Sequence, residues 1–516
     1  MEVNVLIVGA GPTGLTLANE LARQGVSFYL MDKMEKPNLL SKAIAIQART
    51  LELLTRFPEA LNEFLSEGIK LEEGKIFSQN KLLAEIDFRK ISSPYAFVLS
   101  LPQTKTEEIL REQLSFYNKE VNWGNELVTF CVNDSNKIIA HIRTASGEEK
   151  NISCQYLAAC DGAHSAIRKK LQLPFIGSTF TGQQFMLADV LLNKNLPENK
   201  AQIFLNSGRI LAIFPLGNNR FRLIVEKPKT NENPMQILEV EKLLQEMVAK
   251  DLIIKENFWF SEFNINQRKI NQYSVDSIFF LGDAAHIHSP VGGQGMNTGI
   301  QDAINLGWKL AAVIKNNANE KILSTYSEER EVVAKTLLEA TNFATRMTLV
   351  KNKFFILLRD FLLKNLLRLN FIRKKILAGF SELNINYKNS SLTCNLLKSK
   401  NSIQAGYPWP NEKIDNKCWY DLFSCDYFNL IIVNADQKTY QALSSILSVF
   451  AHRLRCFSVQ NESINVPSYF TVINHPNLES LFKIPAIYLV RPDRYLAFTG
   501  NIKDIKSLER FLKSWL

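Results

Sequence analysis

The stretch VNVLIVGAGPTGLTLANELARQGVSFYLMDK, residues 3–33, most constrains what this chain can fold into. Residues 3–8 are a short apolar run typical of a strand, residues 14–24 have helical spacing, and residues 26–31 form a second apolar run. Glycines stand at the turn between the first strand and the helix in the pattern G-x-G-x-x-G, at Gly9, Gly11 and Gly14. The first permits a tight turn, the second lets a pyrophosphate reach the backbone, and the third lets the helix pack on the strand. The stretch therefore predicts a β-α-β unit that binds a dinucleotide.

An acidic residue, Asp32, ends the second strand, where a carboxylate accepts hydrogen bonds from the ribose hydroxyls of a dinucleotide. We include its neighbour Lys33, and Pro12 and Thr13 inside the glycine turn, among the residues expected to contact the cofactor. NAD(P) and FAD both use such a turn, so this unit alone does not choose between them.

A second glycine-rich stretch, LGDAAHIHSPVGGQGMNTGIQDAINLGWKL, covers residues 281–310. An apolar strand is expected over 277–281 and a helix over 297–310, with a loop between them in which glycines let a ligand approach the backbone. The first free N–H groups of the helix attract negative charge. The stretch predicts contact with a ligand that has an electron-rich edge.

Length and composition favour a globular protein of more than one domain. A chain of 516 residues with 46% apolar residues supports two or three packed domains. The net charge of +10 is spread along the chain, which favours anionic cofactors over nucleic acid as partners. The seven cysteines show no metal-like C-x-x-C spacing and suit reduced thiols. A first strand that begins almost at once, without a basic region and cleavage site, leads us to expect a cytoplasmic protein.

The most apolar segment, FFILLRDFLLKNLLRLNFI at 354–372, is too interrupted by charge to suggest a transmembrane segment. The interruptions are Arg359, Asp360, Lys364 and Arg368. Two interpretations remain open: a pair of amphipathic helices that covers the core, which we favour, or helices that contact a membrane surface.

Four further stretches, together with the glycine turn, resemble the FAD-dependent aromatic hydroxylases, the single-component class A flavoprotein monooxygenases. SKAIAIQARTLELL, 41–54, is similar to the R-A…R-T-L-E-L pattern of that family, although Lys42 stands where arginine is usual and loses its two-pronged contact. LSLPQTKTEEILREQL, 99–114, resembles the L-P-Q segment and implies cofactor contacts from Gln103 and Arg111. YLAACDGAHSAIRKKLQLPFIG, 156–177, resembles the D-G motif, with Asp161 and Gly162. Residues 279–311 resemble the second flavin motif, which implies a contact of Asp283 with the ribityl chain and a cofactor contact from its neighbour Gly282.

The resemblance covers roughly residues 1–400 and implies an FAD enzyme. NAD(P)H would reduce the flavin, O2 would add at its C4a atom, and the resulting hydroperoxide would hydroxylate a phenol-like or polycyclic aromatic substrate. The loop 289–295 would lie along the flavin ring, so that the backbone of Pro290 is the catalytic candidate. The other implied flavin contacts there are Gly293, Gly295, Met296 and Asn297.

The substrate would lie against strands within 201–228, where the candidate contacts are Phe204, Phe214 and Arg222. Two nearby histidines, His286 and His288, are too few for a metal site, and no metal is expected. A homodimer is left open.

The expected fold class is α/β, and the expected domains follow from these motifs. They are a Rossmann-like FAD-binding domain (1–180 and 270–345), an inserted β-sheet substrate domain (181–269), a helical segment (346–400) and a thioredoxin-like C-terminal domain (401–516). The last is expected to begin with a linker at 404–413 and lacks a redox C-x-x-C, because NADQKTY stands at that place. Packing or dimerisation is the role we expect for it.

Two alternatives remain. The first is a flavoprotein of the same architecture that acts on an antibiotic, polyketide or polyprenyl substrate; a halogenase is disfavoured because its W-x-W-x-I-P signature is missing. The second is a non-catalytic binder of this fold. The presence of Gly9, Gly11, Gly14, Asp32 and Asp283 argues against a binder, which has no need of a flavin cradle.

Overall fold

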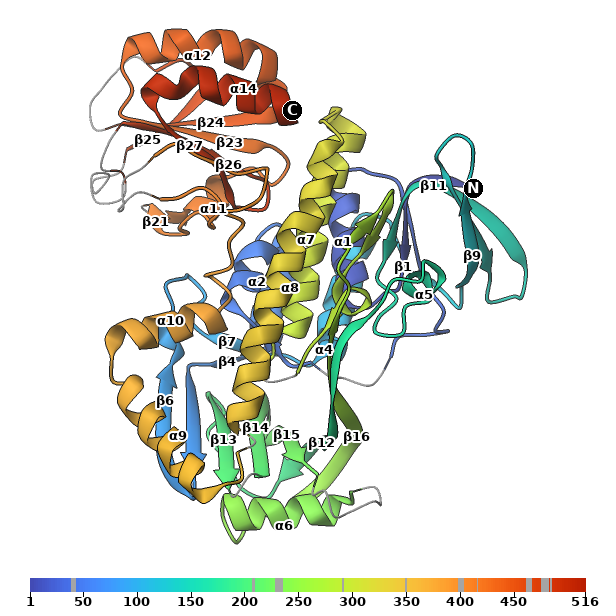
Figure 1. Cartoon of the computed structure of the whole chain (residues 1–516), viewed down its shortest axis with the longest axis vertical. Helices are drawn as coiled ribbons and strands as arrows, with labels where there is room; N and C mark the ends of the chain where they lie inside the picture. Colours follow the sequence, from blue (N-terminus) through green and yellow to red (C-terminus); the bar gives the residue numbers. More distant parts are fainter. Residues whose placement is uncertain are drawn as a thin grey trace.

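The computed structural model of the chain describes residues 1–38, 43–206, 209–227, 235–289, 292–348, 350–397, 403–414, 416–460, 466–474, 482 and 485–516. Two long helices, α7 and α8, run through the middle of the molecule, with a C-terminal domain at one end and a second sheet at the other (Figure 1). The expected α/β class is confirmed.

The first sheet is built on the predicted β-α-β unit. Its strand order is β17-β18-β11-β1-β2-β8; the strands from β18 to β8 run parallel to one another, and β17 is antiparallel to β18. These strands are β1 (Glu2–Val8), β2 (Phe28–Asp32), β8 (Asn122–Trp123), β11 (Glu149–Ala159), β17 (Ser274–Val275) and β18 (Ile278–Phe280); β9 (Glu126–Val132) and β10 (Ile138–Arg143) extend β11. Parallel strands buried on both faces read as continuous apolar runs, which is why the first strand was recognisable in the sequence.

Helices cover this sheet and bring distant motifs together. Helix α1 packs on both α4 and α7, so the glycine turn and the two later motifs meet at the same edge of the sheet. The helices are α1 (Pro12–Arg23), α2 (Ala48–Leu54), α3 (Pro58–Glu67), α4 (Gln103–Ser115), α5 (Ala166–Lys170), α7 (Gly295–Asn316) and α8 (Lys321–Thr348).

The second sheet has the order β19-β16-β12-β15-β14-β13-β5-β6. Most of it comes from the range expected to hold substrate, but β5 and β6 come from earlier in the chain. Its strands are β5 (Glu73–Ser78), β6 (Lys81–Asp87), β12 (Ile176–Leu192), β13 (Lys200–Asn206), β14 (Arg209–Gly217), β15 (Arg220–Glu226), β16 (Ile254–Lys269) and β19 (His286–Ile287). Helix α6 (Ile237–Met247) packs on one face, and a separate small sheet of β3 (Ala45–Ile46), β4 (Ile69–Leu71) and β7 (Val98–Ser100) contacts β14.

The apolar segment 354–372 forms two helices, α9 (Lys353–Leu366) and α10 (Asn370–Phe380), but they do not cover the core as we favoured. In α9 only Ile356 and Arg359 are buried, and in α10 only Leu377. The apolar spacing therefore predicts the two helices correctly. The expectation that their apolar side chains pack on the protein is wrong, because most of these side chains are exposed.

The C-terminal sheet has the order β20-β27-β26-β23-β24-β25, with β23 parallel to β24 and antiparallel to β26, as expected for a thioredoxin-like domain. Its strands are β20 (Cys394–Asn395), β23 (Phe428–Val433), β24 (Leu454–Gln460), β25 (Phe470–Asn474), β26 (Ala486–Val490) and β27 (Leu496–Asn501), with α11 (Trp419–Leu422), α12 (Gln437–Phe450), α14 (Ile505–Trp515) and the hairpin β21 (Lys413–Ile414) and β22 (Lys417–Cys418).

The expected linker at 404–413 is packed rather than free. Trp409 is 1% exposed and contacts the rings of Trp419, Phe423 and Tyr488, so the segment supplies the centre of an aromatic core. Its prolines and glycine resembled those of a linker, but they shape a buried turn.

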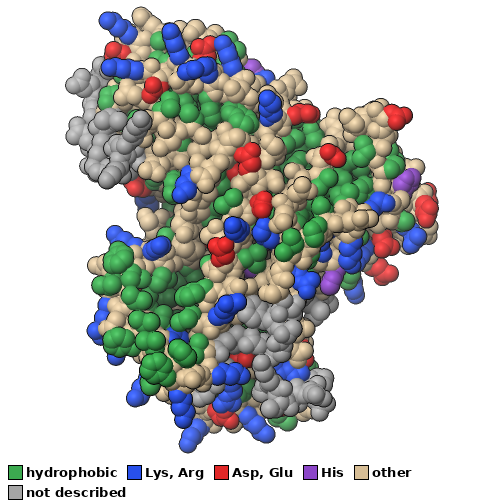
Figure 2. Space-filling view, viewed as in Figure 1, with side chains coloured by type: hydrophobic (Ala, Val, Ile, Leu, Met, Phe, Trp, Pro, Cys, Tyr) green, Lys and Arg blue, Asp and Glu red, His purple; other side chains and the backbone are tan. Residues whose placement is uncertain are grey.

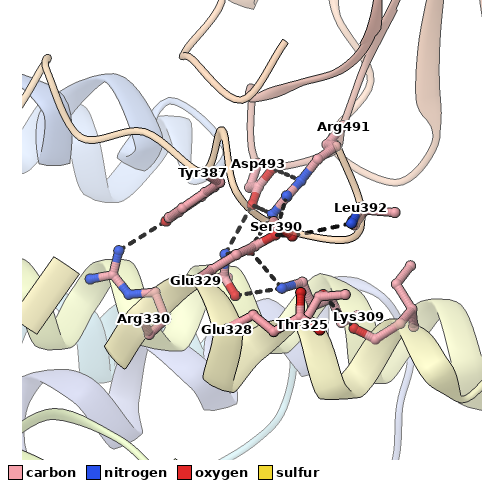
Figure 3. A network of polar contacts seen from close by, with 12 residues as sticks. Lys309, Thr325, Glu328, Glu329, Arg330, Tyr387, Ser390, Leu392, Arg491 and Asp493 are labelled. Carbon is pink, nitrogen blue, oxygen red and sulfur yellow. Dashed lines mark hydrogen bonds and ion pairs between the residues drawn. The ribbon is translucent and has the colours of Figure 1, made fainter. Parts of the chain in front are cut away.

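Buried charges join the C-terminal domain to α7 and α8 (Figure 3). Glu329 of α8 accepts hydrogen bonds from Lys309 of α7 at 2.8 Å and from Arg491, on the loop after β26, at 2.6 and 2.9 Å. Arg491 also pairs with Asp493 at 2.6 Å. Neighbouring positive charges lower the pKa of Glu329 despite its burial, so the carboxylate stays ionised.

Candidate active site

The glycine turn has the geometry that its sequence pattern predicts. At Gly9, whose φ is +106°, a Cβ atom would lie 2.2 Å from the carbonyl oxygen of Cys160, and at Gly14 it would lie 1.9 Å from the carbonyl oxygen of Gly9. At Gly11 it would meet nothing within 4 Å. The outer two glycines therefore allow close packing, whereas the middle one faces open space. No side chain caps the N-terminus of α1, so its free N–H groups point toward that space.

Asp32 fixes the turn from the end of β2. Its carboxylate accepts hydrogen bonds from the backbone N–H groups of Ala10 at 2.8 Å and of Met34 at 2.9 Å. The next residue, Lys33, is exposed. The carboxylate thus lies against the glycine turn, as the fingerprint requires.

Helix α4 presents a row of polar side chains spaced four residues apart. Gln103 donates to Glu107 at 2.9 Å, and its own oxygen accepts from the backbone N–H of Ala43 at 3.2 Å. Burial raises the pKa of Glu107. One turn further, Nη1 of Arg111 is buried and has no hydrogen-bond partner. A buried guanidinium nitrogen without a partner is costly unless a ligand satisfies it.

The D-G motif follows β11. Asp161 accepts from the backbone N–H of Ala166 at 2.8 Å through Oδ2, while its buried Oδ1 has no partner. Burial raises the pKa of this carboxyl group. Gly162 has φ of +76°, and a Cβ atom there would meet nothing within 4 Å. A second stretch of backbone is therefore open toward the same space as Gly11.

The G-D turn after β18 is held from α7. Asp302 accepts from the backbone N–H of Gly282 at 3.0 Å, contacts His286 Nε2 at 2.8 Å and pairs with Arg330 at 2.5 Å. Arg330 keeps the pKa of the buried Asp302 carboxyl below its usual value. Asp283 is exposed into the cavity described below. The network explains His286 as a positioning residue for this turn.

The start of α7 is tied to the chain entering α2. Asn297 accepts from the backbone N–H of Gln47 at 2.8 Å and donates to the carbonyls of Ala45 at 2.8 Å and Gly293 at 2.9 Å. No side chain caps the N-terminus of this helix. Its free N–H groups therefore remain available beside Gly295 and Met296.

A cavity of about 450 Å3 joins these motifs to the second sheet. Its polar end is lined by Gly11, Pro12, Thr13, Gln103, Gly162, Asp283, Gly293, Gly295 and Met296. Its apolar end is lined by Leu71, Ile76, Ile86, Phe88, Ala201, Ile203, Phe214, Ile224 and Phe380. One continuous space thus runs from the glycine turn to the face of the sheet opposite α6.

His288 lines the same cavity near the loop before α7. Burial, reinforced by the neighbouring His286 ring, lowers its pKa to about 4, so the imidazole is neutral near pH 7. Among the residues that the structure describes, no group of three or more His, Cys, Asp or Glu could hold a metal ion.

The three predicted substrate contacts have different positions. Phe214 lines the cavity. Phe204 lies on the opposite face of β13, stacked on Phe77 with ring centroids 4.7 Å apart and packed with the core under α6. Successive side chains of a strand alternate between faces, so its neighbour Ile203 lines the cavity instead.

Arg222 is buried beside the cavity rather than in its lining. It pairs with Asp189 through two hydrogen bonds of 2.7 and 2.8 Å and donates to the carbonyl oxygen of Ala43 at 3.1 Å. Ala43 itself lines the cavity, so Arg222 supports the wall. Lys42 and Pro290 lie outside the described residues.

Sequence reasoning missed the aromatic pair Phe88 and Phe380, whose rings stack 5.5 Å apart in the cavity wall. Phe380 ends α10 and Phe88 follows β6, so no motif connects them. It also missed Lys75, which lines the cavity from β5. Only knowledge that β5 pairs with β13 would have placed that side chain there.

The described part of the chain contains no helix long and apolar enough to cross a membrane. A family model described as an FAD binding domain matches residues 2–341. The chain is 34% identical over 353 residues to an aromatic compound monooxygenase of Bacillus subtilis, covering 67% of this chain and 69% of that one. It is 32% identical to 6-methylpretetramide 4-monooxygenase of Streptomyces rimosus, covering 75% and 71%.

Among solved structures, anhydrotetracycline hydroxylase OxyS from Streptomyces rimosus superposes with a TM-score of 0.78 at 25% identity, covering 100% of this chain and 99% of that one. Fold, motif geometry and sequence similarity agree, and the family match covers most of the chain. This protein belongs to the FAD-dependent aromatic hydroxylases.

Proposed function

We propose that this protein uses NAD(P)H and O2 to hydroxylate a phenol-like or polycyclic aromatic compound. The single observation that carries the proposal is the continuous cavity, which joins a dinucleotide cradle to an apolar wall on the second sheet. Hydroxylation requires the flavin ring to lie beside the substrate ring, and a single continuous cavity allows this, whereas two separate pockets would not.

The residues at the polar end fit FAD. Gly11 and Gly162 leave open space where a pyrophosphate would lie, and the free N–H groups of α1 favour its negative charge. Arg111 Nη1 and Asp161 Oδ1 are buried polar atoms that lack partners and that cofactor groups would satisfy. Asp32 would accept from the adenosine ribose, and Asp283 from the ribityl hydroxyls.

Bound FAD, once reduced by NAD(P)H, supplies the activation of O2 from which one oxygen atom reaches the substrate. The protein would orient the cofactor and substrate and supply the electrostatic environment around them. The free N–H groups at the start of α7 would stabilise negative charge on a flavin bound beside them. Asn297 fixes that helix against the chain at Ala45, and the apolar wall keeps water from the reacting atoms.

The aromatic side chains at the apolar end of the cavity indicate the substrate class. Phe88, Phe380 and Phe214 offer ring faces and edges for an aromatic substrate. Lys75 is the one Lys or Arg among the described lining residues, but it shares a face of β5 with Phe77, and its ammonium lies 3.9 Å from the carboxylate of Glu73, so the described wall presents mainly apolar groups to a substrate. Relatives whose names include 6-methylpretetramide, anhydrotetracycline and pentachlorophenol support both polycyclic and phenolic substrates.

The test begins with purified protein reconstituted with FAD. NADH or NADPH oxidation is followed with a panel of phenols and polycyclic aromatics, and products are examined by mass spectrometry. We expect one class to accelerate oxidation and to gain one oxygen atom. Failure to bind FAD would refute the enzyme, whereas oxidation that yields only hydrogen peroxide with every compound would refute the substrate class.

A further inference from the structure

The outer surface of α9 and α10, which we call the α9–α10 surface (residues 351–376), exposes many large apolar side chains. Phe354, Phe361 and Phe371 are 67%, 65% and 70% exposed. The other exposed apolar residues are Phe355, Leu357, Leu358, Leu362, Leu366, Leu369 and Ile376. Figure 2 shows this patch as a cluster of hydrophobic side chains at the lower left, over the two helices. An exposed apolar patch of this kind marks an interaction site.

Helix α9 differs from a helix that covers a core, because charged residues contact the protein while most of its large apolar side chains are exposed. Its inward contact is a polar clamp: Ser78 donates to Asp360 at 2.6 Å, and Arg359, which is 4% exposed on its side chain, pairs with Asp360 at 2.7 Å. The phenylalanines point away from this clamp. The helix is thus anchored through charge and presents its apolar face outward.

The charge around the patch has one sign. Residues 351–380 contain eight basic residues and a single acidic one, Asp360, which the clamp neutralises. Six of the basic residues are exposed: Lys351, Lys353, Lys364, Arg368, Lys374 and Lys375. In Figure 2, Lys and Arg side chains lie along the rim of the apolar patch. The segment carries most of the net charge of +10.

We propose that the α9–α10 surface binds an anionic lipid bilayer. The apolar side chains would enter the boundary between headgroups and acyl chains, and the basic rim would contact the anionic headgroups. A second copy of this chain fits less well, because a two-fold contact would place two surfaces of the same strong positive charge against each other. The helices lie in the interface and need not span the membrane.

The experiment measures binding of the FAD-reconstituted full chain to vesicles by co-sedimentation. Phosphatidylglycerol vesicles are compared with phosphatidylcholine vesicles, at low and high salt. We expect strong binding to the anionic vesicles that falls as salt rises. The triple variant F354S/F361S/F371S should bind about 100-fold or more weakly, because each exposed phenylalanine contributes apolar burial.

A matched control replaces exposed apolar residues elsewhere: F116S/V132S/V449S, which should bind as the wild type does. Lys353→Gln with Lys364→Gln should weaken binding to anionic vesicles, whereas Lys250→Gln with Lys438→Gln should not. Absence of binding by the wild type, or equal binding by the phenylalanine triple variant, would overturn the proposal. So would light scattering that shows a wild-type dimer which the triple variant converts to a monomer, since the patch would then join two copies.

Discussion

Glu382, which follows α10 beside the cavity, is a buried carboxyl group with incomplete hydrogen bonding. Its Oε2 accepts from Nε2 of Gln301 at 2.5 Å, and its buried Oε1 has no partner. Burial raises its pKa from 4.5 to about 8, although Gln301 and Arg330 act in the opposite direction. The side chain is therefore protonated near pH 7, and we expect it to weaken the fold progressively as pH rises.

The sign and size of the effect follow from the two pKa values. Between pH 4.5 and about 8 the unfolded chain loses the proton that the folded chain keeps. The free energy of unfolding then falls with rising pH, by up to about 1.4 kcal/mol per pH unit. Near pH 7 the free energy of unfolding is therefore ~3 kcal/mol lower than it is below pH 4.5. Glu382→Gln removes the titration, so the variant should match the wild type near pH 5 and be about 3 kcal/mol more stable near pH 7.

The assay is urea unfolding of both proteins at a series of pH values, followed by circular dichroism. Glu59→Gln, at the exposed start of α3, removes one negative charge without burial and serves as the control. A stability gain that is the same at every pH would show that folding does not shift the pKa of Glu382, and a loss that grows toward high pH would show that the folded protein holds it as a stabilised anion; either result would refute the reasoning.

Three further predictions test the site and its supports. Gly11→Ala should melt as the wild type does yet retain less FAD, measured by bound flavin absorbance. Gly14→Ala should fail to fold because its Cβ would lie 1.9 Å from a carbonyl oxygen; equal flavin retention in Gly11→Ala would contradict the pyrophosphate assignment. Phe214→Ala should raise the KM for the aromatic substrate, and Phe204→Ala should instead lower stability by about 3–5 kcal/mol; the reverse pattern in kinetics and urea melts would mean that the faces of the sheet are wrongly assigned. Glu329→Gln should destabilise the protein by about 3–5 kcal/mol, because buried Lys309 loses its counter-charge and Arg491 keeps only Asp493. Limited proteolysis of this variant should release the C-terminal domain more readily; an unchanged digestion pattern would count against the buried ion network as the domain anchor.

The parts of the site that the sequence predicted are those in which backbone geometry dictates residue type. Gly9 and Gly14 are required by close backbone contacts, and Asp32 by the hydrogen bonds it accepts at the turn. Gln103 and Asp283 were placed by resemblance, and both line the cavity. Local rules and motif order were sufficient for these residues.

The remaining differences come from contacts between segments far apart in the chain. Phe204 and Phe214 both lie on predicted strands, and the sequence does not show which side of the sheet each faces. The position of α6 decides this: Phe204 packs under the helix, and Phe214 lines the cavity. Trp409 stands among prolines in a stretch of loop composition, yet the aromatic core around it includes Trp419 of α11 and Tyr488 of β26, from two later segments. The apolar spacing of α9 predicted a helix correctly, but periodicity does not show whether the apolar stripe faces the protein or the outside.

The buried ions of Figure 3 link the C-terminal domain to the site through a single rigid element. Helix α7 begins at Gly295 in the cavity wall and carries Lys309 further along its length. Glu329 and Arg491 bind that lysine end to the loop after β26, with all three side chains at most 1% exposed. Because each ion compensates another in a dry interior, displacing the C-terminal domain would leave unpaired charge against α7. The domain therefore holds the Lys309 part of the helix whose first turn lines the cavity, although none of its own residues is among the described residues that line it.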